Sequence, residues 1–374
     1  MVEISGFAPP RFAAVKDAFA ANFEVGEELG ARFTLVEAGE VVVDLWAGHA
    51  DRKRTRAFDE RTLACVFSTT KALAALLVAR AVDAGKLAYD QKVADVWPEF
   101  AQGGKGDITV EQALSHQAGL PGFLEPMEPS LWVDWDAIAG KLAAMAPMWP
   151  PGTASGYHPI TFGYLAGEIF RRTDGRMMGD AIGEDFRRPF GLDLWIGLPE
   201  SEFDRLAELQ RPSALPNFGQ VNDATRAAFL TPWASVGGVP AAVWRKTQVP
   251  SANGYATAPA LARLMGALAN EGWLDGEQIL SPALIAEATR ERIRGQDLVL
   301  PFVMSWGAGF MRNPPNNPWG PGERTFGHSG WGGSCAFADP DRRLAGAYVM
   351  NKQGTALMGD LRPRRLIEAA YAGL

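Results

Sequence analysis

Ser68-Thr69-Thr70-Lys71 is the stretch on which the interpretation of this 374-residue sequence depends. It is the only place in the chain where a serine is followed three residues later by a lysine. An apolar run at 63–67 with strand or loop character precedes it, and an Ala- and Leu-rich segment up to Gly85 follows it. The pattern predicts a serine at a helix N-terminus, with the lysine one turn along on the same helix face.

This arrangement suits acyl transfer. A serine hydroxyl is a weak nucleophile until a neighbouring group takes its proton. A lysine buried against an apolar helix can lose its charge and become that base. The backbone N–H groups at the start of the helix favour developing negative charge. Because such a short pattern also arises by chance, the interpretation depends on partners elsewhere in the chain.

Composition and charge are those of a soluble globular protein, with 47% hydrophobic residues, 21% charged residues and a net charge of −7. The acidic balance, without clusters of Lys and Arg, argues against nucleic acid or an anionic membrane as the partner. No apolar run approaches the roughly 20 residues that cross a bilayer, and the first ten residues do not read as a secretory signal. We therefore expect a cytoplasmic protein that acts on a small molecule, with its oligomeric state unknown.

The cysteines and histidines indicate neither a disulfide framework nor a metal site. Cys65 and Cys335 are the only cysteines, and buried free thiols are expected. The four histidines show no metal-ligand spacing: His49, His116, His158 and His328. We expect no metal and no other cofactor.

The two ends of the chain predict one antiparallel sheet. Near the N-terminus a helix is expected at 11–23 and a hairpin at 31–48. Near the C-terminus the pattern predicts strands and a last helix, at 305–311, 325–330, 334–338, 344–351 and 361–372. Between about 90 and 290, helical stretches alternate with Pro- and Gly-rich loops, the longest at 211–254.

We therefore predict an α/β (α+β) fold with two parts. Residues 1–89 and 290–374 would form an antiparallel sheet flanked by helices. Residues 90–289 would form a mostly helical insert that makes the other wall of an active-site cleft.

Two further segments supply partners for Ser68. Tyr157 stands directly before a predicted helix that Pro159 favours, so its phenol can project into a cleft. Beside a cationic lysine its pKa would fall, which suits proton transfer to a leaving group. The glycine-rich segment 326–334 contains His328, and its backbone N–H groups could hold an oxyanion. Either segment alone is more often structural.

In this order, Ser68-x-x-Lys71, Tyr157 and His328-Ser329-Gly330 resemble the serine β-lactamase and penicillin-binding-protein superfamily. Within it the chain is most similar to the family VIII carboxylesterases, which share the class C β-lactamase fold. The likeness covers roughly residues 10 to 370, with supporting stretches at 114–120, 251–257 and 280–285.

The resemblance implies a role for each residue. Ser68 would be the nucleophile that forms an acyl-enzyme, and Lys71 with Tyr157 would act as general base and then general acid. The backbone N–H groups of Ser68 and Trp331 would form the oxyanion hole. His328-Ser329-Gly330 would take the place of the Lys-Thr-Gly triplet of β-lactamases and contact the substrate.

Two departures from the β-lactamase pattern matter. The Tyr-x-Asn motif is here Tyr157-His158-Pro159, so the amide is missing. His328 replaces a lysine and is mostly neutral near pH 7, which weakens its grip on a carboxylate. Both changes favour neutral esters over penicillin-like anions, although they do not exclude slow β-lactam hydrolysis. The function that we expect is hydrolysis of esters of short to medium chain length. Tryptophans suggest an apolar acyl pocket, although only Trp331 is expected at the site, and the rest could be core: Trp132, Trp135, Trp233, Trp244 and Trp306.

Other functions fit parts of the pattern. A D-aminopeptidase, a D-alanyl carboxypeptidase or a weak β-lactamase would use the same three residues. A non-catalytic binding protein of the same fold is a remoter alternative. An α/β-hydrolase is excluded, because it needs a histidine after its nucleophile and none follows Ser329.

Overall fold

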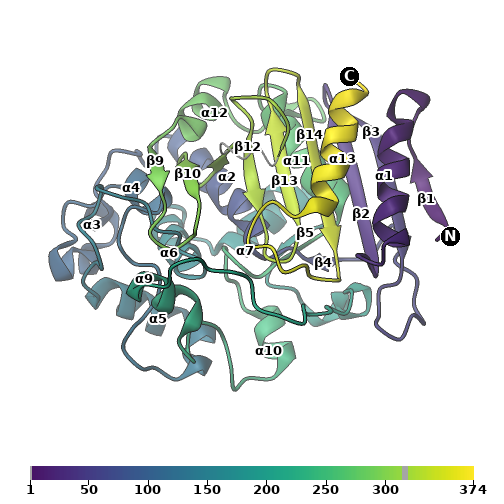
Figure 1. Ribbon diagram of the computed structural model, residues 1–374. Coiled ribbons are helices and arrows are strands. Elements are labelled where there is room, and N and C mark those ends of the chain that lie inside the picture. The colour runs from purple at the N-terminus through teal and green to yellow at the C-terminus, as the bar shows by residue number, and fades with distance from the viewer. Residues whose placement is uncertain (1, 314–318) are drawn as a thin grey trace.

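The computed structural model describes residues 2–313 and 319–374. Its centre is a nine-stranded antiparallel sheet built from both ends of the chain (Figure 1). Its strands are β1 (Ile4–Phe7), β2 (Gly30–Glu37), β3 (Glu40–Gly48), β9 (Ile293–Gln296), β10 (Val303–Trp306), β11 (Met311–Arg312), β12 (Phe326–Ser329), β13 (Cys335–Asp339) and β14 (Leu344–Met350). They are ordered β1-β3-β2-β14-β13-β12-β11-β10-β9, which confirms the predicted fold class.

The two ends of the chain meet where β2 pairs with β14, from Glu37 opposite Leu344 to Ala31 opposite Met350. All seven residues of β14 are buried, as expected for an apolar strand in the middle of a sheet that is covered on both faces. The hairpin of β2 and β3 lies where the sequence predicts it.

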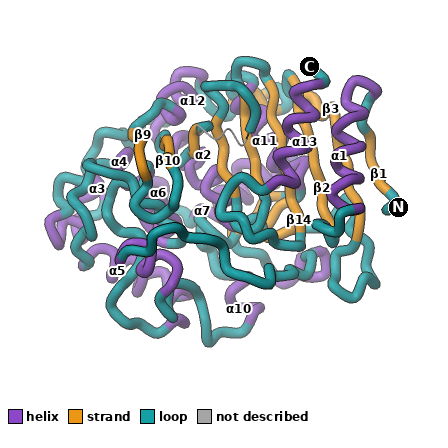
Figure 2. The backbone as a smooth tube through the Cα atoms, in the orientation of Figure 1, coloured by secondary structure: helices purple, strands orange, loops and turns teal. Residues whose placement is uncertain are grey.

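Helices cover both faces of the sheet (Figures 1 and 2). On one face lie α1 (Ala13–Glu24) and α13 (Leu361–Ala372), side by side, and on the other lie α11 (Ala258–Ala269) and α2 (Thr70–Asp83). Helix α2 is buried along almost its whole length. It follows β4 (Ala64–Cys65), which pairs in a small sheet with β6 (Gly254–Ala256) and, beyond it, β5 (Leu194–Ile196).

The remaining helices gather mostly beside one end of the large sheet (Figure 2). They are α3 (Val93–Val96), α4 (Val110–Leu114), α5 (Trp135–Ala144), α6 (Thr161–Asp174), α7 (Met178–Ile182), α8 (Arg188–Phe190), α9 (Asp223–Thr225), α10 (Ala241–Lys246) and α12 (Pro282–Thr289), with a short hairpin of β7 (Trp273–Leu274) and β8 (Glu277–Gln278). The division at residues 89 and 290 stays a prediction. Helix α11 lies inside the proposed insert but packs on β2 and β14.

Some predicted elements need correction. The segment 305–311 is not one strand, because the chain turns after Trp306 and the Gly307 N–H donates to the Phe310 carbonyl at 2.9 Å. It therefore forms the end of β10 and the start of β11. Strands β1 and β9 were not predicted. Within the described ranges, no helix has both the length and the apolar character needed to cross a membrane.

Candidate active site

Ser68 lies in the turn that joins β4 to α2. The turn is a short 3₁₀ helix, Phe67–Thr69, and α2 continues from Thr70. Phe67 adopts a φ of 45°, which is uncommon for a residue with a side chain. Thr70 holds this conformation, because its hydroxyl donates to the Phe67 carbonyl and accepts from the Gly254 N–H at 2.9 Å. The side chain of Ser68 is left half-exposed at the start of the helix, as predicted.

Lys71 lies one turn further along α2 and is completely buried. Its Nζ is 3.1 Å from Ser68 Oγ, 2.7 Å from the Pro159 carbonyl oxygen and 3.0 Å from the Ser251 carbonyl oxygen. Burial lowers the pKa of this amine well below its usual value. A neutral amine has two N–H groups and one lone pair. The two carbonyls can accept those N–H groups, which leaves the lone pair facing the Ser68 hydroxyl.

Tyr157 completes the group. Its ring centroid lies 4.8 Å from Lys71 Nζ, and its hydroxyl is hydrogen-bonded to Ser68. Burial raises the pKa of Tyr157, and this effect outweighs the lowering by the Ser68 hydrogen bond. The predicted fall in the Tyr157 pKa is therefore wrong. That prediction assumed a cationic Lys71, whereas burial favours the neutral amine.

Asp297 fixes the loop that carries Tyr157. Its buried carboxylate accepts from the Tyr157 backbone N–H at 2.9 Å and from the Ser155 hydroxyl at 3.0 Å. It also accepts from the N–H groups of Val299 and Leu300, which closes a turn between β9 and β10. Sequence reasoning missed this residue. The only signal for it was an aspartate followed by apolar residues, which is typical of many turns.

We expect Asp297→Asn to lower kcat/KM for an ester about tenfold, because an amide oxygen is a weaker acceptor than a carboxylate for the Tyr157 N–H and the amide NH2 cannot accept from the Ser155 hydroxyl, so Tyr157 is held less firmly. Steady-state kinetics and thermal unfolding of the variant measure this. Asp341 lies in the turn between β13 and β14. Asp341→Asn is the control and should behave as wild type. A folded Asp297→Asn enzyme with unchanged kinetics would contradict the positioning role.

The end of β12 provides an open backbone edge beside Ser68. Strand β11 pairs only with Phe326 and Gly327, so His328 and Ser329 have β13 alone as a neighbour. Within the described residues, the backbone N–H groups of Ser68 and Trp331 donate to no protein acceptor. Two such free N–H groups are what an oxyanion hole requires.

Ser334 ties the two sides of this edge together. Its hydroxyl donates to the Val66 carbonyl at 2.8 Å and lies 3.1 Å from Thr69 Oγ1. The chain passes so close here that a Cβ on Gly330 would lie 2.1 Å from Ser334 Oγ and 2.3 Å from the Val66 oxygen. Only glycine fits at position 330, which explains the glycine of the His328-Ser329-Gly330 triplet.

The other predicted site residues occupy different places. His328 is buried, and burial lowers its pKa to about 3, which agrees with the neutral imidazole expected from the sequence. Its ring lies 6.1 Å from the Tyr157 ring, and its Nδ1 is 2.7 Å from the Ser329 carbonyl oxygen. Ser329 borders a cavity of about 20 Å³ next to α13. Trp331 is 40% exposed, and its ring meets edge to face the ring of Phe67, the residue that precedes Ser68.

An aromatic cluster behind Tyr157 was missed by the sequence. Trp306 stacks on Tyr157 with an interplanar angle of 10°, and His116 lies 4.4 Å from Trp306 and 4.9 Å from Tyr157. Trp306 is completely buried, so it is a core tryptophan that supports Tyr157 from behind, and the expectation that only Trp331 lies at the site stays a prediction. Trp132 and Trp135 instead pack on Tyr164 in the helical part.

Burial also sets the charge of this cluster. It lowers the pKa of His116 well below its usual value and that of His158 to about 3, so both rings are neutral. In the part of the chain that the structure describes, no three His, Cys, Asp or Glu side chains are grouped as a metal site requires.

Comparison with known proteins agrees with this fold. The profile of the family described as Beta-lactamase matches residues 17–371. The chain is 34% identical to the esterase/beta-lactamase LipL of Mycobacterium tuberculosis, over 93% of this chain and 83% of that protein. A penicillin-binding-protein homologue from Caulobacter crescentus is 66% identical with a TM-score of 0.98, and a family VIII carboxylesterase is 44% identical with a TM-score of 0.92. Both structures match over 100% of each chain.

A family match over nearly the whole chain, relatives named as esterases and a shared fold lead to one conclusion. The chain belongs to the beta-lactamase family and is a hydrolase of the esterase type.

Proposed function

We propose that the protein is a serine carboxylesterase that hydrolyses short- to medium-chain esters through an acyl-enzyme on Ser68. The observation that carries this proposal is the contact of 3.1 Å between Ser68 Oγ and the buried amine of Lys71. A neutral amine at that distance can take the hydroxyl proton as the oxygen attacks.

The reaction follows from the same contacts. As Ser68 Oγ bonds to the ester carbonyl carbon, its proton passes to Lys71, and the N–H groups of Ser68 and Trp331 hold the oxyanion. The carbon–oxygen bond to the alcohol then breaks, and the proton returns to the leaving oxygen through Lys71 and the Tyr157 hydroxyl. Water repeats the sequence on the acyl-enzyme and releases the acid.

The charges of the site favour neutral substrates. Burial lowers the pKa of Lys71 and so favours its neutral form, and His328, with its pKa lowered to about 3, is neutral where β-lactamases carry a lysine. Neither group offers a positive charge to a substrate carboxylate. The half-exposed rings of Phe67 and Trp331 give the entrance an apolar surface that suits an acyl chain. The relatives named as esterases support the same choice.

Two measurements on the wild-type protein test this function. We expect rapid hydrolysis of p-nitrophenyl acetate, butyrate and octanoate, with slow cleavage of nitrocefin and of D-alanine p-nitroanilide. A fluorophosphonate should label one serine, and mass spectrometry should place the label on Ser68. Faster turnover of the D-amino-acid amide would favour a peptidase, and no turnover with no labelling would favour a binding protein.

A further inference from the structure

We propose that Arg362, on α13, is a positioning residue for the oxyanion hole, because it holds the loop that presents the Trp331 N–H. The inference rests on the proposed function, which assigns that N–H to the developing oxyanion. Arg362 is far from Ser68 in sequence and has no place in the motifs that identify the family.

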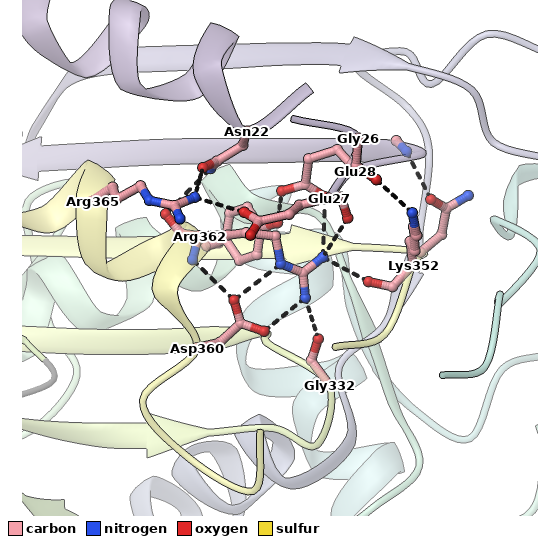
Figure 3. Close-up of polar contacts among 12 residues, drawn as sticks. Asn22, Gly26, Glu27, Glu28, Gly332, Lys352, Asp360, Arg362 and Arg365 are labelled. Carbon is pink, nitrogen blue, oxygen red and sulfur yellow. Dashed lines mark hydrogen bonds and ion pairs between the residues drawn. The ribbon is translucent and has the colours of Figure 1, made fainter. Parts of the chain in front are cut away.

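Arg362 is 3% exposed and fully engaged in hydrogen bonds (Figure 3). Its Nη2 donates to the Gly332 carbonyl at 2.6 Å, and its Nη1 donates to the Lys352 carbonyl at 2.7 Å. Asp360 takes two further bonds, from Nε at 3.0 Å and from Nη2 at 2.8 Å. The guanidinium is planar, and its N–H donors point in fixed directions. Because Asp360 and the Lys352 carbonyl hold the guanidinium in place, they also fix the position of the Gly332 carbonyl that it binds.

The loop at 330–334 is closed by two backbone hydrogen bonds of its own, from the Gly330 N–H to the Ser334 carbonyl at 2.7 Å and from the Gly333 N–H to the Gly330 carbonyl at 3.2 Å, so its remaining freedom lies at the Trp331–Gly332 peptide. Gly332 and Gly333 have φ angles of 89° and 128°, and neither has a side chain that could pack. At that peptide, the Gly332 carbonyl accepts from the Gly354 N–H at 2.9 Å as well as from Arg362, and the Trp331 carbonyl accepts from Gln353 Nε2 at 3.2 Å. The cavity of about 20 Å³ that borders Gly333 and Asp360 is large enough for about one water molecule, which could take the place of a lost Arg362 donor without holding the Gly332 carbonyl in one position.

Arg362 is surrounded by more charged side chains than the packing of α13 would need. Glu28 lies 3.2 Å from Nη1, accepts from the Tyr348 hydroxyl and is completely buried among these groups. Burying one cation between Asp360 and Glu28 has a desolvation cost that apolar side chains would not have. A buried charged cluster stabilises less than its contacts suggest, but it fixes geometry. Here the fixed geometry is that of the loop beside the nucleophile.

Arg365 offers a matched control on the same helix. Its Nη1 donates to Asn22 Oδ1 at 2.8 Å and to Glu27 Oε2 at 2.6 Å. It therefore joins α13 to the same segment near α1 but does not touch the loop at 330–334. An effect that both arginines share is structural, whereas an effect of Arg362 alone reports on the loop.

The test compares hydrolysis of p-nitrophenyl butyrate and of its thionoester by wild type, Arg362→Gln, Arg362→Lys and Arg365→Gln. Sulfur is a weaker hydrogen-bond acceptor than oxygen, so a thionoester gains less from the oxyanion hole. We expect Arg362→Gln to lower kcat for the oxygen ester by about tenfold to a hundredfold, with little change in KM. This is less than the roughly 10²- to 10³-fold loss on removing a whole donor, because the Trp331 N–H is displaced and not removed. The thionoester should lose less, so the preference for oxygen over sulfur falls.

Loss of stability alone would lower both activities equally and would leave the preference unchanged. Arg362→Lys keeps the charge but not the fork and should show an intermediate loss, and Arg365→Gln should keep the wild-type preference. If Arg362→Gln does not fold, Arg362→Lys and Gln353→Met, which removes the bond to the Trp331 carbonyl, decide the question. An unchanged preference in the folded variants would overturn the proposal.

The proposed function and this inference fail in different ways. A wild-type protein that hydrolyses no ester, or that is not labelled on Ser68, would overturn the function itself. Labelling of Ser68 together with unchanged kinetics of the Arg362 variants would overturn the positioning role alone.

Discussion

Replacing Ser68 with alanine is expected to lower kcat/KM for p-nitrophenyl butyrate by at least about 10⁴-fold, as removal of a serine nucleophile does in other hydrolases. Alanine keeps the backbone N–H and the helix start but leaves no oxygen to form the acyl-enzyme. The amine of Lys71 then has no proton to accept, although it stays 2.7 Å from the Pro159 carbonyl oxygen. Steady-state kinetics with the chemical hydrolysis rate subtracted measure the loss.

Two controls make this result specific. The variant should lose fluorophosphonate labelling while its thermal unfolding stays close to that of wild type, because Ser68 is only half-buried. Ser201→Ala, at an exposed position in the 3₁₀ helix Glu200–Arg205 that follows β5, should keep full activity and labelling. Ester turnover that survives in Ser68→Ala, with a label on another serine, would show that the nucleophile has been misassigned.

The sequence predicts the site residues that lie close together in the chain, but not the residues that surround them in the fold. Ser68 and Lys71 are three residues apart on one helix, so their proximity follows from helix geometry alone. The end of β12 could also be anticipated, because glycine density marks a close backbone approach. Together these residues were sufficient to indicate the family and the fold.

The environment that sets the chemistry could not be predicted in this way. Asp297 contacts Tyr157 across 140 residues, and Arg362 contacts Gly332 across 30 residues and from another element. Neither contact leaves a pattern in a single sequence. The direction of the Tyr157 pKa was missed for the same reason, since it depends on how completely the folded chain buries Tyr157 and Lys71.

Replacing Lys71 with methionine or arginine separates two roles that a lysine can have. As a neutral base it accepts the proton of Ser68, whereas as a cation it would only stabilise negative charge. Methionine supplies neither function. Arginine supplies the charge but does not lose its proton in proteins. We expect both variants to lower kcat/KM by about 10³-fold or more, because general acid–base catalysis typically contributes about 10²- to 10⁴-fold. An arginine variant that keeps a tenth of the activity would favour the cation.

The pH dependence of the wild-type enzyme gives an independent test of the same role. Because burial lowers the pKa of Lys71, its amine becomes neutral at a lower pH than an exposed lysine does. Activity should therefore be present above that lowered pKa and fall as the pH drops through it, when the base gains a proton and its charge. Burial lowers the pKa values of His158 and His328 to about 3. These two histidines would therefore account only for a fall in activity near pH 3.

The fall at acid pH should be absent from the residual activity of Lys71→Met, since the group that titrates has been removed. Measurements of kcat/KM from about pH 5 to 9 for wild type and variant compare the two profiles directly. A variant that retains the wild-type profile at a lower rate would assign the base to another group, and Tyr157, whose hydroxyl is hydrogen-bonded to Ser68, would then be the residue to replace. If kcat/KM of Lys71→Met does not change with pH where that of wild type falls, the buried amine of Lys71 is the proton acceptor.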